Sequence, residues 1–189
     1  MKFPVLGFAV MATVLIAGCG PNLTATPTSP TTTTPAQSPF ISQFGGFFNG
    51  TLTLVRVSGG ECVGDVMQAD IGTVEVGTVV ISQTQTDVTA VVRSASTGLS
   101  CRYSGTAGPG AFALHTQACE VNQILFQCTN GASRVLEQVG STFTATLASG
   151  GATGTVTTFY NVFSNSTEED QRRPVAGLVL EEHFNAVRR

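Results

Sequence analysis

The five cysteines are the residues of this chain whose chemistry is best defined by their positions. A cysteine thiolate can act as a nucleophile or a metal ligand, and two thiols can oxidise to a disulfide in an exported protein. One cysteine follows an apolar N-terminal segment, and four lie in the body of the chain: Cys19, then Cys62, Cys101, Cys119 and Cys128. The later four contain no CxxC pair, so their spacing argues against a zinc site.

The segment before Cys19 has the layout of an export signal. Met1 and Lys2 form a short positive region, and residues 3–17 are almost wholly apolar. A transmembrane helix needs about 20 apolar residues, so this run has the length of a signal-peptide h-region. We therefore expect residues 1–18 to be a signal peptide.

The motif Ile16-Ala17-Gly18-Cys19 resembles the lipobox of bacterial lipoproteins. The resemblance implies that the Cys19 thiol receives a diacylglyceryl group, that cleavage follows Gly18, and that the new amino group is acylated, for example with palmitate. Two or three acyl chains would anchor the protein stably, since each buried methylene contributes about 0.8 kcal/mol. Gly20 replaces the Asp that retains many lipoproteins in the inner membrane, which favours the outer membrane if the cell has one. The alternative is an ordinary secretory signal with an incidental cysteine.

If the protein is exported, the four remaining cysteines imply two disulfides. Three pairings are possible. We favour Cys119–Cys128, which would close a short loop between neighbouring strands, and therefore Cys62–Cys101.

The chain is sparsely charged, and its net charge is −3. Lys2 is the only lysine and leaves with the signal peptide, so the mature chain has Arg as its sole strong base. A nucleic-acid partner would require a basic stripe, and none is present. The expected attachment to the membrane is therefore the N-terminal lipid.

No set of residues predicts catalysis, a metal or a cofactor. His115 is expected on the outer face of a strand, and His183 lies beside Glu181 and Glu182, whose side chains would point to the opposite face. The sequence contains no Gly-x-Ser-x-Gly elbow and no phosphate-binding loop. We therefore expect a protein that is not an enzyme.

The elements that would position these residues are predominantly strands. Residues 19–43 form a Thr- and Pro-rich segment that predicts a disordered tether, and residues 44–189 form one domain. Residues 51–57 and 141–147 alternate apolar and polar side chains, as a half-buried strand does. Gly140 is expected to separate the strand at 141–147 from another at 134–138. Asn130-Gly131 is expected to form the turn of a hairpin between the strand at 134–138 and the strand before it.

Two segments are ambiguous. Residues 61–71 have apolar side chains near helical spacing and predict a short helix or an irregular crossover. Residues 178–187 predict a closing strand, with a C-terminal amphipathic helix as the alternative.

Together the patterns predict an all-β fold, an antiparallel meander of about 8–10 short strands. Closure into an up-and-down barrel is favoured because it removes the open edges of the sheet, and a β-sandwich is the second choice. The segment Gly46-Phe47-Phe48-Asn49-Gly50-Thr51 resembles the opening of lipocalin- and avidin-like barrels, with Phe48 in place of the Trp whose ring plugs one end.

The expected function is that of a lipid-anchored envelope protein outside the cytoplasm. If the barrel is hollow, it would bind a small apolar ligand, with these lining candidates: Phe112, Leu114, Phe143, Leu147 and Phe159. The alternative is a module with a filled core that docks another envelope protein. A hydrolase ranks last because no catalytic set is present.

Overall fold

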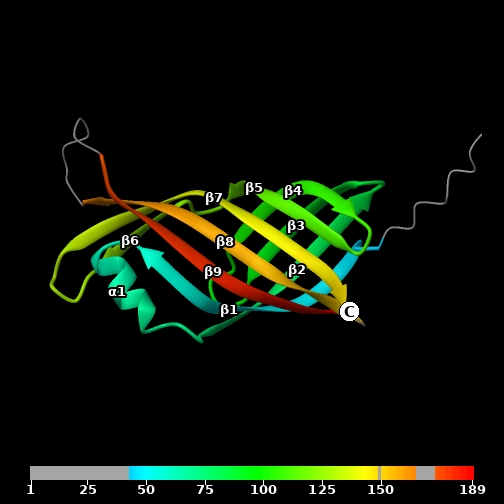
Figure 1. The fold of residues 1–189 in the computed structure, drawn as a ribbon, viewed down its shortest axis with the longest axis horizontal. Helices are drawn as coiled ribbons and strands as arrows, with labels where there is room; N and C mark the ends of the chain where they lie inside the picture. Colours follow the sequence, from blue (N-terminus) through cyan, green and yellow to red (C-terminus); the bar gives the residue numbers. More distant parts are fainter. Residues whose placement is uncertain (1–42, 149, 165–172) are drawn as a thin grey trace, which may run out of the picture. The chain divides into compact units, whose positions relative to one another are not determined.

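Alternating side chains produce strands along most of the chain (Figure 1). The computed structural model describes residues 43–148, 150–164 and 173–189. The predicted signal peptide, Cys19 and residues 20–42 of the predicted tether lie outside these residues. In the described part, nine strands and one helix follow in this order: β1 Gly46–Gly59, α1 Cys62–Gln68, β2 Val74–Thr84, β3 Asp87–Ser94, β4 Ser100–Gly108, β5 Ala111–Cys119, β6 Gln123–Gln127, β7 Ser133–Ala148, β8 Gly151–Ser164 and β9 Pro174–Arg188.

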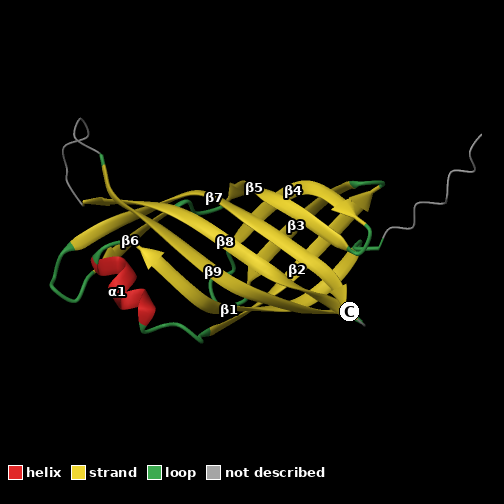
Figure 2. Cartoon of the chain, viewed as in Figure 1, coloured by secondary structure: helices red, strands yellow, loops and turns green. Residues whose placement is uncertain are grey.

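Eight strands close into an antiparallel barrel. Neighbours along the chain pair with one another from β1 to β5 and from β7 to β9, β9 returns to β1, and β5 pairs with β7. The predicted all-β meander and its up-and-down barrel are confirmed, and a sandwich is not formed (Figure 2).

The four longest strands continue beyond the barrel. One end of β7, at residues 142–146, pairs with β5, while its other end, at residues 133–137, pairs with β6. The outer parts of β1, β7, β8 and β9 therefore form, with β6, a second stretch of sheet that we call the extension. Helix α1 lies at this extension, away from strands β2 to β4 (Figure 1).

Two hydrophobic cores correspond to these two parts. The barrel core contains a chain of edge-to-face aromatic rings, in which Phe112 and Phe184 both contact Phe143 at centroid distances of 5.0 and 4.8 Å. Such pairs contribute about 0.5–1.5 kcal/mol each beyond the burial of their area. The extension core is smaller and includes Val63 from α1 and Leu178 from β9.

An aromatic side chain and an arginine close the barrel end opposite the extension. Phe48 is buried there, and the Arg188 guanidinium lies 5.3 Å from its ring centroid. Arg188 also donates hydrogen bonds to the carbonyl oxygens of Gln43 and Gly45, at 2.9 and 3.1 Å. Phe48 thus lies in the barrel core near this end, beneath the Arg188 guanidinium.

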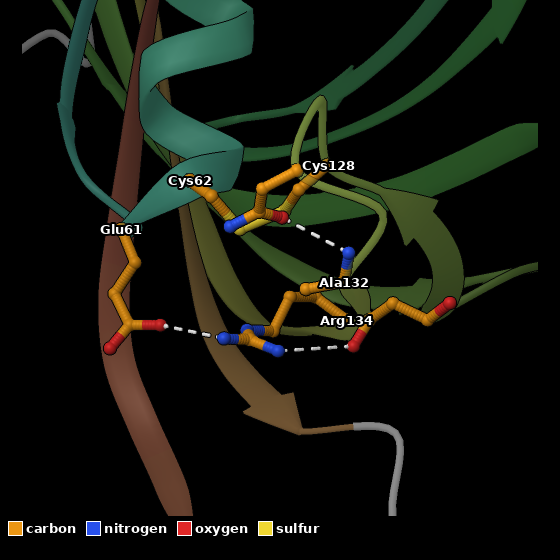
Figure 3. Close-up of polar contacts among 7 residues, drawn as sticks. Glu61, Cys62, Cys128, Ala132 and Arg134 are labelled. Atoms are coloured by element: carbon orange, nitrogen blue, oxygen red, sulfur yellow. Dashed lines mark hydrogen bonds and ion pairs between the residues drawn. A yellow bond between two sulfur atoms is a disulfide. The ribbon is translucent and has the colours of Figure 1, made fainter.

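The disulfides join different cysteines from those we favoured. Cys101 and Cys119 are register partners on β4 and β5, with Cα atoms 4.1 Å apart. Cys62, the first residue of α1, is bonded to Cys128, just after β6 (Figure 3). The favoured pairing is wrong because β5 runs back along β4, which sets Cys119 opposite Cys101. Cys128 lies in the extension, where it pairs with Cys62 instead of Cys119.

Close backbone contact also fixes α1 against the sheet. A Cβ on Gly64 would collide with the carbonyl oxygen of Gly59, so this helix position has room only for glycine. The Arg134 guanidinium, 3.4 Å from the Glu61 carboxylate, adds an ion pair beside the Cys62–Cys128 disulfide (Figure 3).

Several local predictions have definite outcomes. The short helix near residues 61–71 and the closing strand near 178–187 are confirmed by α1 and β9. The turn at Asn130-Gly131 joins β6 to β7, with Gly131 at φ +82°. The expected break at Gly140 is wrong, because β7 continues through it with a register shift between Gln138 and Gly140. Part of the polar loop that follows β8, residues 165–172, lies outside the described residues.

Candidate functional site

A cavity of about 290 Å³ lies inside the barrel at the end next to the extension. We call it the mouth cavity. Leu99, Val121 and Ile124 line it and are 40–49% exposed, so they mark the side on which it meets solvent. Its remaining apolar lining includes Leu52, Val92, Phe143, Val156 and Phe184.

Strand alternation selects which side chains face this cavity. On β9, Glu182 and Phe184 lie on the inner face, and on β8 the inner face carries Val156, Thr158 and Tyr160. Register then places these residues beside one another: Glu182 lies opposite Val156 of β8 on one side and opposite Leu54 of β1 on the other.

The aromatic chain of the barrel core forms one boundary of the cavity. Phe143 and Phe184 both line the cavity and pack edge to face below it. Tyr103 contacts Phe143 at a centroid distance of 5.8 Å, and its hydroxyl accepts a hydrogen bond from Ser141 Oγ at 3.1 Å. The barrel is therefore filled at the Phe48 end and hollow at the extension end.

Two carboxyl groups give the cavity its polar character. The Glu75 carboxylate accepts hydrogen bonds from the hydroxyls of Ser94 and Ser96, the latter at 3.2 Å. The Glu182 carboxyl accepts no hydrogen bond and forms no ion pair with any residue that the structure describes. Burial raises the pKa of Glu182 to about 7, and the negative charge of Glu75 adds to this increase.

Two phenols face the same space. Burial raises the pKa of Tyr160 to about 12, with the charge of Glu182 as the second cause. Burial also raises the pKa of Tyr103. Both phenols stay protonated at physiological pH, so each can donate one hydrogen bond.

A larger hollow of about 1080 Å³ lies over outward-facing residues of the barrel wall, among them Thr53, Thr155 and His183. It is open to solvent, and seven of its lining residues are threonines. Ligands are bound in places that bury most of their surface, which favours the mouth cavity over this larger hollow.

The structure separates the ligand-lining candidates into three groups. Phe143 lines the mouth cavity. Phe112 and Leu114 are buried in the barrel core. Leu147 and Phe159 are 38% and 39% exposed, and neither lines the mouth cavity. On β8, Tyr160 rather than Phe159 lies on the inner face.

The polar residues of the cavity were missed. Glu75 and Glu182 each occupy an inward position of an alternating strand, a place normally taken by apolar residues, and this was the available signal. His183 does lie on the face opposite Glu182, and His115 is exposed on β5.

In the described part of the chain, no group of three or more His, Cys, Asp or Glu side chains could hold a metal ion. The carboxyls of the cavity can accept hydrogen bonds or balance a positive charge, and its phenols can donate.

Within residues 43–148, 150–164 and 173–189, no helix has the length and apolar character to cross a membrane. Comparison with known proteins found no matching family model, no matching curated protein and no matching solved structure.

Proposed function

We propose that this chain is a non-enzymatic, lipid-anchored protein of the bacterial cell envelope whose barrel binds a small, largely apolar molecule outside the cytoplasm. The observation that carries the binding role is the mouth cavity of about 290 Å³. The lipobox at Ile16-Ala17-Gly18-Cys19 supports the anchor and the compartment.

The chemistry of the cavity supports this role. Small closed barrels are either filled by side chains or hold one small ligand, and ligand sites combine an apolar wall with a few placed polar groups. Here Phe143, Phe184 and Val156 supply apolar surface, while Glu182 and Tyr160 supply the polar groups.

Two neighbouring valines on β3 allow a matched test. Val92 lines the cavity, and Val91 is 37% exposed and absent from its lining. We expect Val92→Phe to fill the cavity and weaken binding of the neutral dye N-phenyl-1-naphthylamine at least about tenfold, since overlap with a filling side chain excludes the ligand. Fluorescence titration of the full mature chain measures the affinity.

Val91→Phe is the control, and it should bind the dye as the unchanged protein does. Equal dye affinity in both variants, or no dye binding by the unchanged protein, would contradict the proposed site. Urea denaturation of each variant checks that the barrel stays folded.

The second candidate function is a module that docks another envelope protein. It is favoured by β6, which pairs only with β7 in the described part of the chain and leaves Ile124 and Leu125 49% and 68% exposed. An open edge with apolar side chains can accept a strand from a partner. Crosslinking in the native envelope that captures one protein through residue 125, together with failure of dye binding, would favour this alternative.

A further inference from the structure

The Glu182 carboxyl is a polar group of the mouth cavity on the inner face of β9, where the neighbouring inward residue Phe184 is apolar. It lies between Leu54 and Val156 in the register, and no described residue donates a hydrogen bond to it or forms an ion pair with it. The Glu182 side chain is half-buried. A carboxylate that is partly removed from water and has no partner is costly, so an inward glutamate here destabilises the protein unless it meets something else.

Among the described residues that line the cavity, no side chain carries a positive charge that could balance this carboxylate. The titratable groups among the described residues that line the cavity are Glu75, Tyr103, Tyr160 and Glu182, from β2, β4, β8 and β9. None of these lining residues is Arg, Lys or His. Next to Glu182 along the chain, Glu181 points to the other face, where it lies 3.9 Å from the Arg56 guanidinium.

Glu75 supplies the second carboxylate of the cavity, and two serines hold it in place. Ser94 and Ser96 donate hydrogen bonds to Glu75, which orients its carboxylate at the cavity wall. Leu52, which also lines the cavity, is the register partner of Glu75 on one side and of Phe184 on the other. The same space thus combines two acidic groups with an aromatic and aliphatic surface.

We propose that the mouth cavity binds a small amphiphilic organic cation, such as a protonated primary amine with an apolar tail, whose charge is balanced by Glu182 and Glu75. The tail packs on Phe143, Phe184 and Val156, and the ammonium donates hydrogen bonds to the carboxylates. This inference rests on the proposed binding function and names the class of its ligand.

The charge of the site discriminates between ligand classes. An ammonium group inside a poorly solvated cavity gains from a nearby carboxylate, whereas a carboxylate ligand is repelled by Glu75 and Glu182. A neutral alcohol gains the apolar contacts alone. A cation is therefore preferred over a neutral ligand, and a neutral ligand over an anion.

Three ligands that share one tail test this order. Hexylamine, hexanol and hexanoate are titrated into the full mature chain by calorimetry at about pH 8, where Glu182 is ionised and the amine is protonated. We expect hexylamine to bind at least about tenfold more tightly than hexanol, and hexanoate to bind most weakly.

Two variants on β9 identify the group responsible for the preference for hexylamine over hexanol. Glu182→Gln keeps the shape of the side chain and removes its charge, so the preference for hexylamine over hexanol should fall to within about twofold. Glu181→Gln removes a charge from the outer face and should leave the preference unchanged. At about pH 5.5, hexylamine binding should weaken in the unchanged protein and not in Glu182→Gln, because protonation at that pH removes the charge of Glu182, whose pKa is raised to about 7.

The outcomes separate the two proposals. If neither the three ligands nor the neutral dye binds, the proposed binding function is wrong. If hexanol binds as tightly as hexylamine, or Glu182→Gln keeps the preference, apolar binding stands and the cation inference is overturned.

Discussion

At the scale of single residues, Glu182 places a carboxyl group on the inner face of β9. Its neighbours on the inner face of β9 are Phe184 and Leu180, and both contribute to hydrophobic cores. An acidic side chain at that position costs stability when it is charged. No described side chain bonds to this carboxyl, which explains the cost and also leaves the carboxyl available to a ligand.

The raised pKa of Glu182 predicts how stability depends on pH. Its pKa is about 7 in the folded protein and 4.5 in the unfolded chain, so the folded state binds more protons between these values. The stability contributed by this residue is present below about pH 4.5 and is lost as the pH rises through about 7.

We therefore expect Glu182→Gln to increase the free energy of unfolding at about pH 8, by at most about 3 kcal/mol, and to have little effect near pH 4. Urea denaturation at the two pH values measures the difference. A variant less stable than the unchanged protein at about pH 8 would contradict the assignment of the raised pKa to burial.

At the scale of elements, the extension depends on α1 and its disulfide. Helix α1 has only seven residues, too few to be stable alone in water. Its Val63 is fully buried, and Cys62 fastens it to Cys128 across 66 residues of sequence. The barrel has its own disulfide, Cys101–Cys119, which closes a shorter loop.

Removal of the Cys62–Cys128 disulfide should therefore loosen the extension before the barrel. The loop-entropy relation gives a loss of about 4 kcal/mol for a loop of this length, against about 3 kcal/mol for Cys101–Cys119. In a Cys62→Ser/Cys128→Ser variant, hydrogen exchange should accelerate most in α1 and β6, while β2 to β4 stay protected.

The control is Cys101→Ser/Cys119→Ser, which should increase exchange in β4 and β5 instead. Uniform acceleration across the whole barrel in the first variant would show that the extension and the barrel unfold as one unit, contrary to this prediction.

At the scale of the whole molecule, the proposed place of the protein depends on its first residues. The lipobox and the tether lie outside the described residues, so their role stays a prediction from sequence. A barrel that binds small amphiphiles and is held at a membrane surface would act where such molecules accumulate.

Replacement of Cys19, the predicted lipidation site, tests this placement. We expect Cys19→Ala to abolish labelling by a palmitate analogue and to move the protein from the membrane fraction to the soluble fraction, since the acyl chains provide the anchor. Immunoblots of both fractions measure the change. Membrane association that persists without labelling would point to a different attachment.

The amino-acid sequence by itself was sufficient to predict the all-β meander and the turn at Asn130-Gly131, and it limited the segment near Cys62 to a short helix or an irregular crossover. These features depend on residues close together in the chain, through side-chain alternation and glycine conformations. Tertiary structure alone decided the pairing of the cysteines and the placement of Glu75 and Glu182 in the lining of one cavity. Both depend on which strands become neighbours and in which register, and a shift of one residue would turn every inward side chain outward.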